Sequence, residues 1–352
     1  MCKNINNFLK VVFFIVIFFA LFVNISSVLS LEESAITQFY DYEDDSIDVV
    51  LIGSSSTLMH YNSALVYKEF GIASGLLATP RQPFSATEYL IREAKKNQHP
   101  QLYVIDIGLV NRDLNDVEAF PEAAIRSVTD TMKSSSNRMN AINGMMKYTP
   151  VDEDNKLSMY VNFLKYHSSW KELFTKDSQG RTSLIKGHLL DENAALMMKE
   201  MKKVNWNPTL QQDLIAGNQE VLKKLVDYID EENLNVLFII PVKYFSDEEM
   251  GGLNSATTYL ESRDKKVVNF NFYSDDIGID FNTDFFNITH LNVQGSTKYT
   301  LYLGTYLKSN YDIKGDQENK NHQKWEEAYK TYKAKYKEYT GKDYEQLLES
   351  VK

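Results

Sequence analysis

A small, hydroxyl-rich turn follows the first strongly apolar run outside the N-terminus. Residues 51–60 read LIGSSSTLMH and place three serines directly behind Gly53. A turn of this kind can carry a nucleophile or hold an anion, because the helix behind it points free N–H groups and its positive dipole end at the turn. A serine here can equally cap the helix. No Gly-Lys-Ser or Gly-Lys-Thr follows, so the turn is a poor phosphate-binding loop.

A histidine far along the chain has the setting of a general base. His290 lies in DFFNITHLNVQGS, just before a helical pattern that places Tyr299, Leu303, Tyr306 and Leu307 on one face. In an open α/β sheet, ligands bind in loops at the carboxyl ends of the strands, so we expect this segment to meet the serine turn. There the imidazole can take a hydroxyl proton, provided a third group fixes its tautomer. A purely structural histidine is the alternative.

Four buried apolar runs, separated by helical patterns, predict the scaffold for these two segments. They are IDVVLIG (47–53), LYVIDIG (102–108), NVLFIIP (235–241) and the weaker KVVNFNF (266–272). Continuous runs of this type are typical of parallel strands buried on both faces. SATE at 85–88 predicts a capping box, and residues 219–234 predict an amphipathic helix. We therefore predict a doubly wound, mostly parallel α/β sheet of the three-layer type over residues 46–315.

Two further segments stand apart from the sheet. Residues 117–210 are rich in Met, Asn, Lys and Ser and hold no strong strand, which predicts a mainly helical insertion. Residues 316–352 predict a C-terminal amphipathic helix. Its aromatic residues recur every three or four positions: Trp325, Tyr329, Tyr332, Tyr336 and Tyr339. This stripe either docks on the domain or offers a flat apolar surface to a partner or carbohydrate.

Residues 1–31 read as an export signal. The stretch at 11–23 is wholly apolar, and Val28 and Ser30 offer small residues for cleavage. A cleaved signal peptide and a retained membrane anchor both remain open. The wholly apolar part has the length of a signal-peptide core, whereas residues 11–31 together number 21, close to the ~20 that a spanning helix needs. We expect an extracytoplasmic domain, held at the cell membrane by an N-terminal helix or secreted after cleavage.

Composition narrows the chemistry. Acidic residues outnumber basic ones by 48 to 38 and no basic patch is visible, so nucleic acid is not an expected partner. The only cysteine, Cys2, precedes the apolar stretch, which leaves the exported part without a disulfide or a thiol nucleophile. No paired His or Cys spacing predicts a metal site.

The serine turn and the histidine segment together resemble the SGNH (GDSL-type) hydrolase superfamily, and more closely its membrane-tethered, DltD-like and alginate-O-acetylation-like members in Gram-positive bacteria. The resemblance runs from residue 47 to roughly residue 310 and includes the HQKWEEAYKTY tail. It implies a catalytic serine at Ser55, in GSS, and a catalytic histidine at His290. It also implies an O-acetyltransferase or O-acetylesterase that uses no cofactor. Its substrate would be a cell-surface polysaccharide or teichoic-type polymer, and a membrane-bound O-acyltransferase its partner.

One position departs from the family pattern. The aspartate expected three residues before the histidine is Asn287 here. An amide can orient an imidazole but cannot stabilise imidazolium as a carboxylate does. Asp284, six residues before His290, is the candidate substitute. The departure also supports an alternative function, a catalytically weakened surface protein that binds glycan or an acyltransferase.

The resemblance also implies donors for a tetrahedral oxyanion. The backbone N–H of Ser55 is one of them. The other candidates lie within residues 71–85 and in the loop that begins at the end of the run 102–108, where Arg112 could instead bind an anionic substrate. These candidate oxyanion or substrate-binding residues are Gly75, Thr79 through its backbone, Gln82 through its side chain, Asn111 and Arg112.

Overall fold

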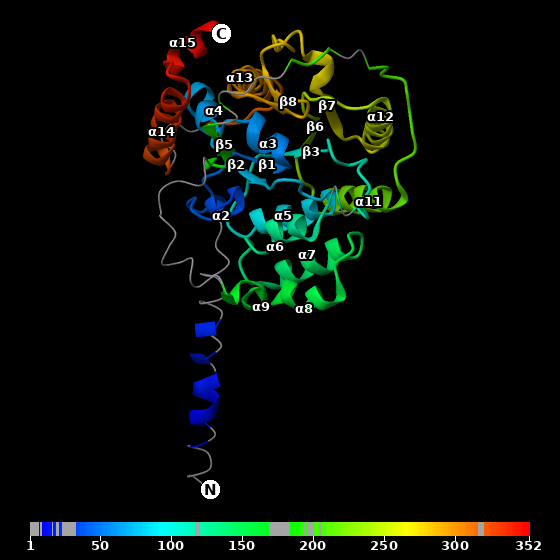
Figure 1. Cartoon of the computed structure of the whole chain (residues 1–352), viewed down its shortest axis with the longest axis vertical. Coiled ribbons are helices and arrows are strands. Elements are labelled where there is room, and N and C mark those ends of the chain that lie inside the picture. The colour runs from blue at the N-terminus through cyan, green and yellow to red at the C-terminus, as the bar shows by residue number, and fades with distance from the viewer. Residues whose placement is uncertain are drawn as a thin grey trace.

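A five-stranded parallel sheet forms the centre of the molecule (Figure 1). The computed structural model describes residues 7, 9–15, 17–18, 21–22, 33–116, 118, 120–168, 184–192, 195, 200–203, 206–315 and 320–352. The strands are β1 (Val49–Gly53), β2 (Ser74–Ala78), β3 (Leu102–Asp106), β6 (Val236–Ile240) and β7 (Lys266–Asn269). Their order is β2-β1-β3-β6-β7, and every neighbouring pair is parallel. The predicted doubly wound α/β fold is confirmed.

Helices cover both faces of the sheet, so successive residues of each strand enter two different cores. Val50 and Ile52 of β1 pack in one core and Val49 and Leu51 in the other. The first core takes side chains from α2 (Ala35–Phe39), α5 (Thr87–Ala94), α11 (Ala216–Glu231) and α12 (Asp247–Ser262). The second takes them from α3 (Ser55–His60), α4 (Ser63–Phe70) and α13 (Val293–Asn310). Burial on both faces explains why the strands read as unbroken apolar runs.

Strand β2 was not predicted. Its sequence, SGLLA, is short and begins with two small residues, which gives little strand signal. Gly75 is needed because a Cβ there would lie 2.5 Å from the ring of Phe39 in α2. The predicted run at 266–272 divides into β7 and the 3-10 helix η3 (Phe270–Tyr273).

The predicted capping box at 85–88 does not form. Residues Phe84–Ala86 make a 3-10 turn, η1, and α5 starts after it with no side-chain cap. The hydroxyl of Ser85 is buried without a hydrogen-bond partner. The 3-10 turn moves the start of the α-helix past the serine, so the hydroxyl cannot reach the amide three residues on.

The described part of residues 117–210 is mainly helical, as predicted. It contains α6 (Glu122–Thr129), α7 (Ser136–Met146), α8 (Glu153–Tyr160), α9 (Asn162–Tyr166) and a small hairpin of β4 (Leu184–Ile185) and β5 (His188–Leu189). Helices α6 and α7 lie against each other, and α7 contacts α5 on the face of the sheet away from α13 (Figure 1). Residues 117, 119, 169–183, 193–194, 196–199 and 204–205 of this segment lie outside the described residues.

The C-terminal segment forms two helices rather than one. Helix α14 (His322–Thr340) ends at Gly341, whose positive φ of 69° turns the chain, and α15 (Tyr344–Val351) follows. Trp325 and Tyr332 of the aromatic stripe are 0% exposed. Trp325 stacks on Tyr67 of α4 at a centroid distance of 5.4 Å. The aromatic stripe therefore docks on the domain. Most of it is buried and does not form an exposed surface for a partner or carbohydrate. Residues 316–319 lie outside the described part.

The predicted membrane contact through an N-terminal helix is wrong by this structure. Within the described residues, no helix has both the length and the apolar character needed to cross a bilayer. Residues 1–6, 8, 16, 19–20 and 23–32 of the predicted signal segment lie outside the described residues.

Candidate active site

The serine turn lies where the winding of the sheet reverses. After β1 the chain first adds β2 on one side and then β3 on the other, and crevices at such a reversal are where α/β proteins bind ligands. Strand β1 ends at Gly53 and α3 starts at Ser55. A Cβ on Gly53 would lie 2.0 Å from Thr57 Oγ1 and 2.7 Å from Asp106 Cβ. Glycine therefore allows the tight turn that presents Ser55.

The histidine reaches this serine from a hairpin. Strands β8 (Phe285–Asn287) and β9 (His290–Leu291) pair with each other, and the N–H of Leu291 donates to Nε2 of His60 in α3 at 3.0 Å. That bond ties the hairpin to the helix that begins with Ser55. Nε2 of His290 lies 2.7 Å from Ser55 Oγ. The predicted meeting of Ser55 and His290 is confirmed.

Asn287, and not Asp284, holds the other ring nitrogen. Nδ1 of His290 lies 3.0 Å from Asn287 Oδ1. The same oxygen accepts from the backbone N–H and the hydroxyl of Thr289, both at 2.9 Å. These donors orient the amide with its oxygen toward the ring. Nδ1 therefore carries the proton and Nε2 accepts from the serine hydroxyl, which is the tautomer that a general base needs.

The carboxylate of Asp284 has a structural role. It is 0% exposed and accepts from Lys298 Nζ at 2.8 Å and Gln294 Nε2 at 3.0 Å. Its backbone oxygen accepts from the N–H of Asn292, which in turn caps α13. Its proposed contact with the imidazole is therefore corrected: these bonds turn Asp284 toward α13, where it joins the hairpin to the helix. The side chain of Asn292 caps α13, and a Cβ on Gly295 would lie 2.3 Å from the backbone oxygen of Asp284, so both residues shape this turn.

The surroundings of the His290 imidazole favour its neutral form. Burial, reinforced by the nearby charge of Lys243, lowers the pKa of His290 to about 4. Because a general base must be unprotonated to accept a proton, this shift keeps His290 in its reactive form at neutral pH. The missing carboxylate is consistent with the direction of the shift, since an anion in place of Asn287 would raise the pKa.

Among the oxyanion candidates within residues 71–85, Gly75 and the side chain of Gln82 do not line the cavity over the serine. Gly75 lies inside β2, paired with Val50. Thr79 and Gln82 are buried and bond to each other, with Thr79 Oγ1 donating to Gln82 Oε1 at 3.3 Å. Arg81, which lies between them, lines the catalytic cavity. Thr79 and Gln82 hold the loop in shape; the intervening residues face the site.

The third predicted donor, Asn111, is also turned away. Its amide packs on α12, where a Cβ on Gly252 would lie 2.1 Å from Asn111 Nδ2, and Nδ2 donates to the backbone oxygen of Glu248 at 3.5 Å. Arg112 does line the cavity, as predicted for a substrate-binding residue, but its guanidinium is paired with Glu249 at 2.6 Å. That ion pair neutralises most of its charge.

The cavity over the serine has a volume of about 480 Å³. Its lining includes Ser55, His290, Leu109, Phe120 and Lys243. Lys243 was not predicted as a site residue. It lies three residues after β6, and its position beyond a strand end is its only signal in the sequence. The backbone N–H of Lys243 donates to Asn271 at 3.0 Å, and the next N–H, of Tyr244, donates to Ile288 at 2.8 Å. These bonds fix the loop after β6 against the histidine hairpin.

Asp106 is a second residue of the site that was not predicted from the sequence. It ends β3, is 7% exposed, and accepts from the N–H of Gly108 at 2.7 Å and from Thr57 Oγ1 at 3.3 Å. It also accepts from the N–H of Ser54. An acidic residue inside an apolar strand run was the available signal. Asp106 braces the turn that carries Ser55.

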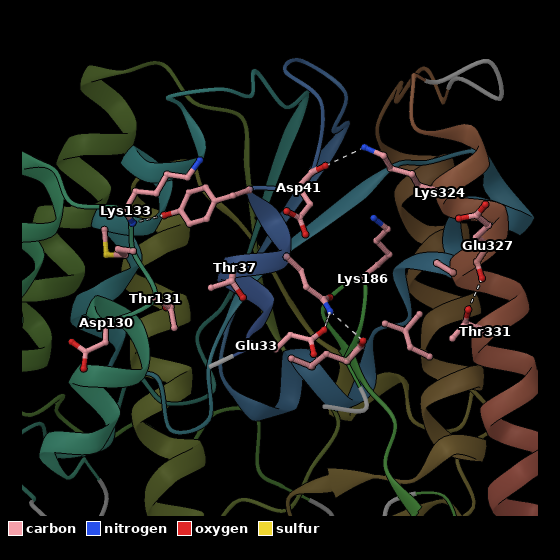
Figure 2. A pocket seen from close by; sticks show the side chains of 16 residues that line it. Glu33, Thr37, Asp41, Asp130, Thr131, Lys133, Lys186, Lys324, Glu327 and Thr331 are labelled. Carbon is pink, nitrogen blue, oxygen red and sulfur yellow. Dashed lines mark hydrogen bonds between the residues drawn. The ribbon is translucent and has the colours of Figure 1, made fainter. Parts of the chain in front are cut away.

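A second cavity lies away from the serine, between α2, α14 and the β4–β5 hairpin (Figure 2). Its volume is about 760 Å³, and charged side chains from several elements line it, including Lys133, Lys186 and Glu327. It contains neither Ser55 nor His290. The cavity over the serine is therefore distinguished by its paired serine and histidine and not by its size.

The geometry stands without support from relatives. No protein-family model matches this chain, and no curated protein matches it either.

Proposed function

We propose that this protein is a serine-dependent acyl-ester enzyme. The observation that carries the proposal is the 2.7 Å contact between Ser55 Oγ and His290 Nε2, with Nδ1 of the same ring bonded to Asn287. A hydroxyl bonded to an oriented imidazole is the arrangement that generates an oxygen nucleophile. The contact lies in a cavity at the sheet reversal, where substrate can reach it.

The reaction proceeds in two halves. Ser55 Oγ attacks the acyl carbonyl carbon while its proton passes to His290 Nε2, and the carbonyl electron pair moves onto oxygen. As that pair returns, the bond from carbon to the leaving alcohol breaks and His290 gives the alcohol its proton. Water or a second hydroxyl then repeats the sequence on the acyl-Ser55 ester. Hydrolysis and acyl transfer use the same residues and differ only in the acceptor.

Ser55 also supplies one donor for the oxyanion. It opens α3, and the first N–H groups of a helix have no partner within the helix itself. The N–H of Ser55 is therefore available to the oxygen of an ester bound to its own side chain. From the SGNH resemblance we take the substrate to be an O-acetyl ester on a cell-surface polysaccharide or teichoic-type polymer.

Hydrolysis of p-nitrophenyl acetate tests the proposal. We expect turnover by the unchanged protein and its loss, by orders of magnitude, in Ser55→Ala and in His290→Ala. Ser85→Ala is the matched control, because the Ser85 hydroxyl is buried without a partner outside the cavity lining. Full activity in Ser55→Ala would refute the proposal, and no turnover by the folded, unchanged protein would favour the non-catalytic alternative. Acetate release from an O-acetylated polysaccharide, compared with transfer to an unacetylated oligosaccharide, then identifies the acceptor.

A further inference from the structure

The amine of Lys243 is buried, and no neighbouring carboxylate pairs with it directly. Burial lowers the pKa of this amine, while the charges of Asp106 and Glu249 act in the opposite direction. The residue is 5% exposed. Among the described residues its ammonium forms no hydrogen bond and no salt bridge, and it lies 4.8 Å from the centroid of the Phe245 ring. A charge removed from water without a partner is costly, so such groups are retained where an opposite charge arrives.

The nearest carboxylate is already in use. A Cβ on Gly108 would lie 3.2 Å from Lys243 Nζ and 2.9 Å from Asp106 Oδ1, so the two groups lie on the same side of that glycine. The oxygens of Asp106, however, accept from Gly108, Ser54 and Thr57. Asp106 balances part of the lysine's charge through space and leaves the ammonium protons available to another acceptor.

The side chain faces the catalytic cavity. Lys243 lines the same cavity as Ser55 and His290, and its charge acts on the imidazole. The side-chain donors expected for an oxyanion are elsewhere: Asn111 packs on α12 and Gln82 bonds to Thr79. An ester attacked by Ser55 therefore has the backbone N–H of that residue on one side, and neither of these two side chains supplies a further donor.

We propose that Lys243 is a catalytic residue whose ammonium binds the oxyanion formed when Ser55 attacks the acyl carbonyl. This inference rests on the proposed function. The oxygen that gains the electron pair is the only atom of a neutral ester that becomes anionic before the alcohol leaves. Placed beside it, the ammonium is worth most in the transition state, where the charge develops. The same oxyanion offsets the repulsion between Lys243 and the imidazolium form of His290.

A neutral ester separates this role from binding of a charged substrate. Lys243→Met keeps the length of the side chain and removes the charge. With p-nitrophenyl acetate we expect kcat to fall by about 10²- to 10³-fold, with KM little changed. Lys243→Arg should recover part of the loss, since a guanidinium keeps the charge. Melting temperatures of both variants verify that they fold.

Lys186→Met is the matched control. Lys186 is a half-buried lysine whose pKa is likewise lowered by burial, and it lies over the aromatic rings of Tyr42 and Trp325. Its side chain lies in the second cavity, away from Ser55 (Figure 2). We expect its kcat to equal that of the unchanged protein.

Three outcomes overturn the inference. In the first, Lys243→Met turns over the neutral ester as fast as the unchanged protein. In the second, Lys243→Met loses rate only with esters that bear a carboxylate or phosphate, which would assign Lys243 to substrate charge. In the third, the unchanged protein forms no acyl-Ser55, and then the proposed function fails as well. The first two leave the proposed function intact, so the two failures are distinguishable.

Discussion

Under the proposed function, replacing Asn287 by aspartate should speed ester hydrolysis and shift its pH profile. In serine proteases, changing the triad aspartate to asparagine costs about 10⁴-fold, because the amide favours the wrong imidazole tautomer. Here Thr289 donates two hydrogen bonds to Asn287 Oδ1, which keeps the oxygen on the His290 side. The tautomer is already correct, so the only component missing is the negative charge.

The size of the effect follows from the 3.0 Å separation of Asn287 Oδ1 and His290 Nδ1. A carboxylate at that distance raises the pKa of an imidazole by roughly 1 to 3 units. From a starting pKa of about 4, the Asn287→Asp variant should titrate between roughly 5 and 7. Each unit is worth about 1.4 kcal/mol of imidazolium stabilisation. Because the proton is only partly transferred in the transition state, we expect kcat to rise by about 10- to 100-fold.

The assay is kcat/KM for p-nitrophenyl acetate measured from pH 3.5 to 8. Asn287→Asp should show a higher plateau and an acid limb displaced upward, and Asn287→Ala a lower plateau. Asp284→Asn serves as the control, because that carboxylate does not contact the ring. A variant whose acid limb stays in place, or whose plateau falls, would refute the assignment of Asn287 as the group that orients His290.

Further expectations concern the unchanged site and the packing around it. In the unchanged enzyme kcat/KM should rise as the pH increases through about 4, where His290 loses its proton, and stay level to neutrality. Asp284→Ala leaves Lys298, 15% exposed, without its buried partner; we expect urea unfolding to show a loss of about 3–5 kcal/mol, whereas an unchanged stability would contradict the structural role. Trp325→Ala should cost about 3–5 kcal/mol by the same method, since the indole is 0% exposed.

Much of the scaffold could be predicted from the sequence, because parallel strands buried on both faces have a distinctive composition. Strands β1, β3, β6 and β7 all lie in predicted runs. Strand β2 lacks this apolar composition. Its pairing with β1 and its packing on Phe39 stabilise it as a strand although its residues have low strand propensity. The capping box predicted at 85–88 fits the local sequence, but it does not form because residues Phe84–Ala86 make a 3-10 turn before α5.

The site was predictable where its residues lie next to regular elements. Ser55 follows directly on β1, and His290 and Asn287 lie in one hairpin before α13, so the sheet topology was enough to bring them together. The remaining donors were not predictable in this way. Whether Asn111 faces the cavity or α12 depends on the close approach of Gly252. Lys243 enters the site only because its loop bonds to residues 271 and 288, contacts that no local pattern encodes.

The most direct test of the account is the position of a covalent adduct. The unchanged protein is incubated with a fluorophosphonate, digested, and its peptides are analysed by mass spectrometry, with His290→Ala treated in parallel. We predict a single adduct on Ser55, formed far more slowly when His290 is absent, because the imidazole must take the hydroxyl proton. An unmodified Ser55 in the folded protein, or labelling at the same rate without His290, would contradict the account.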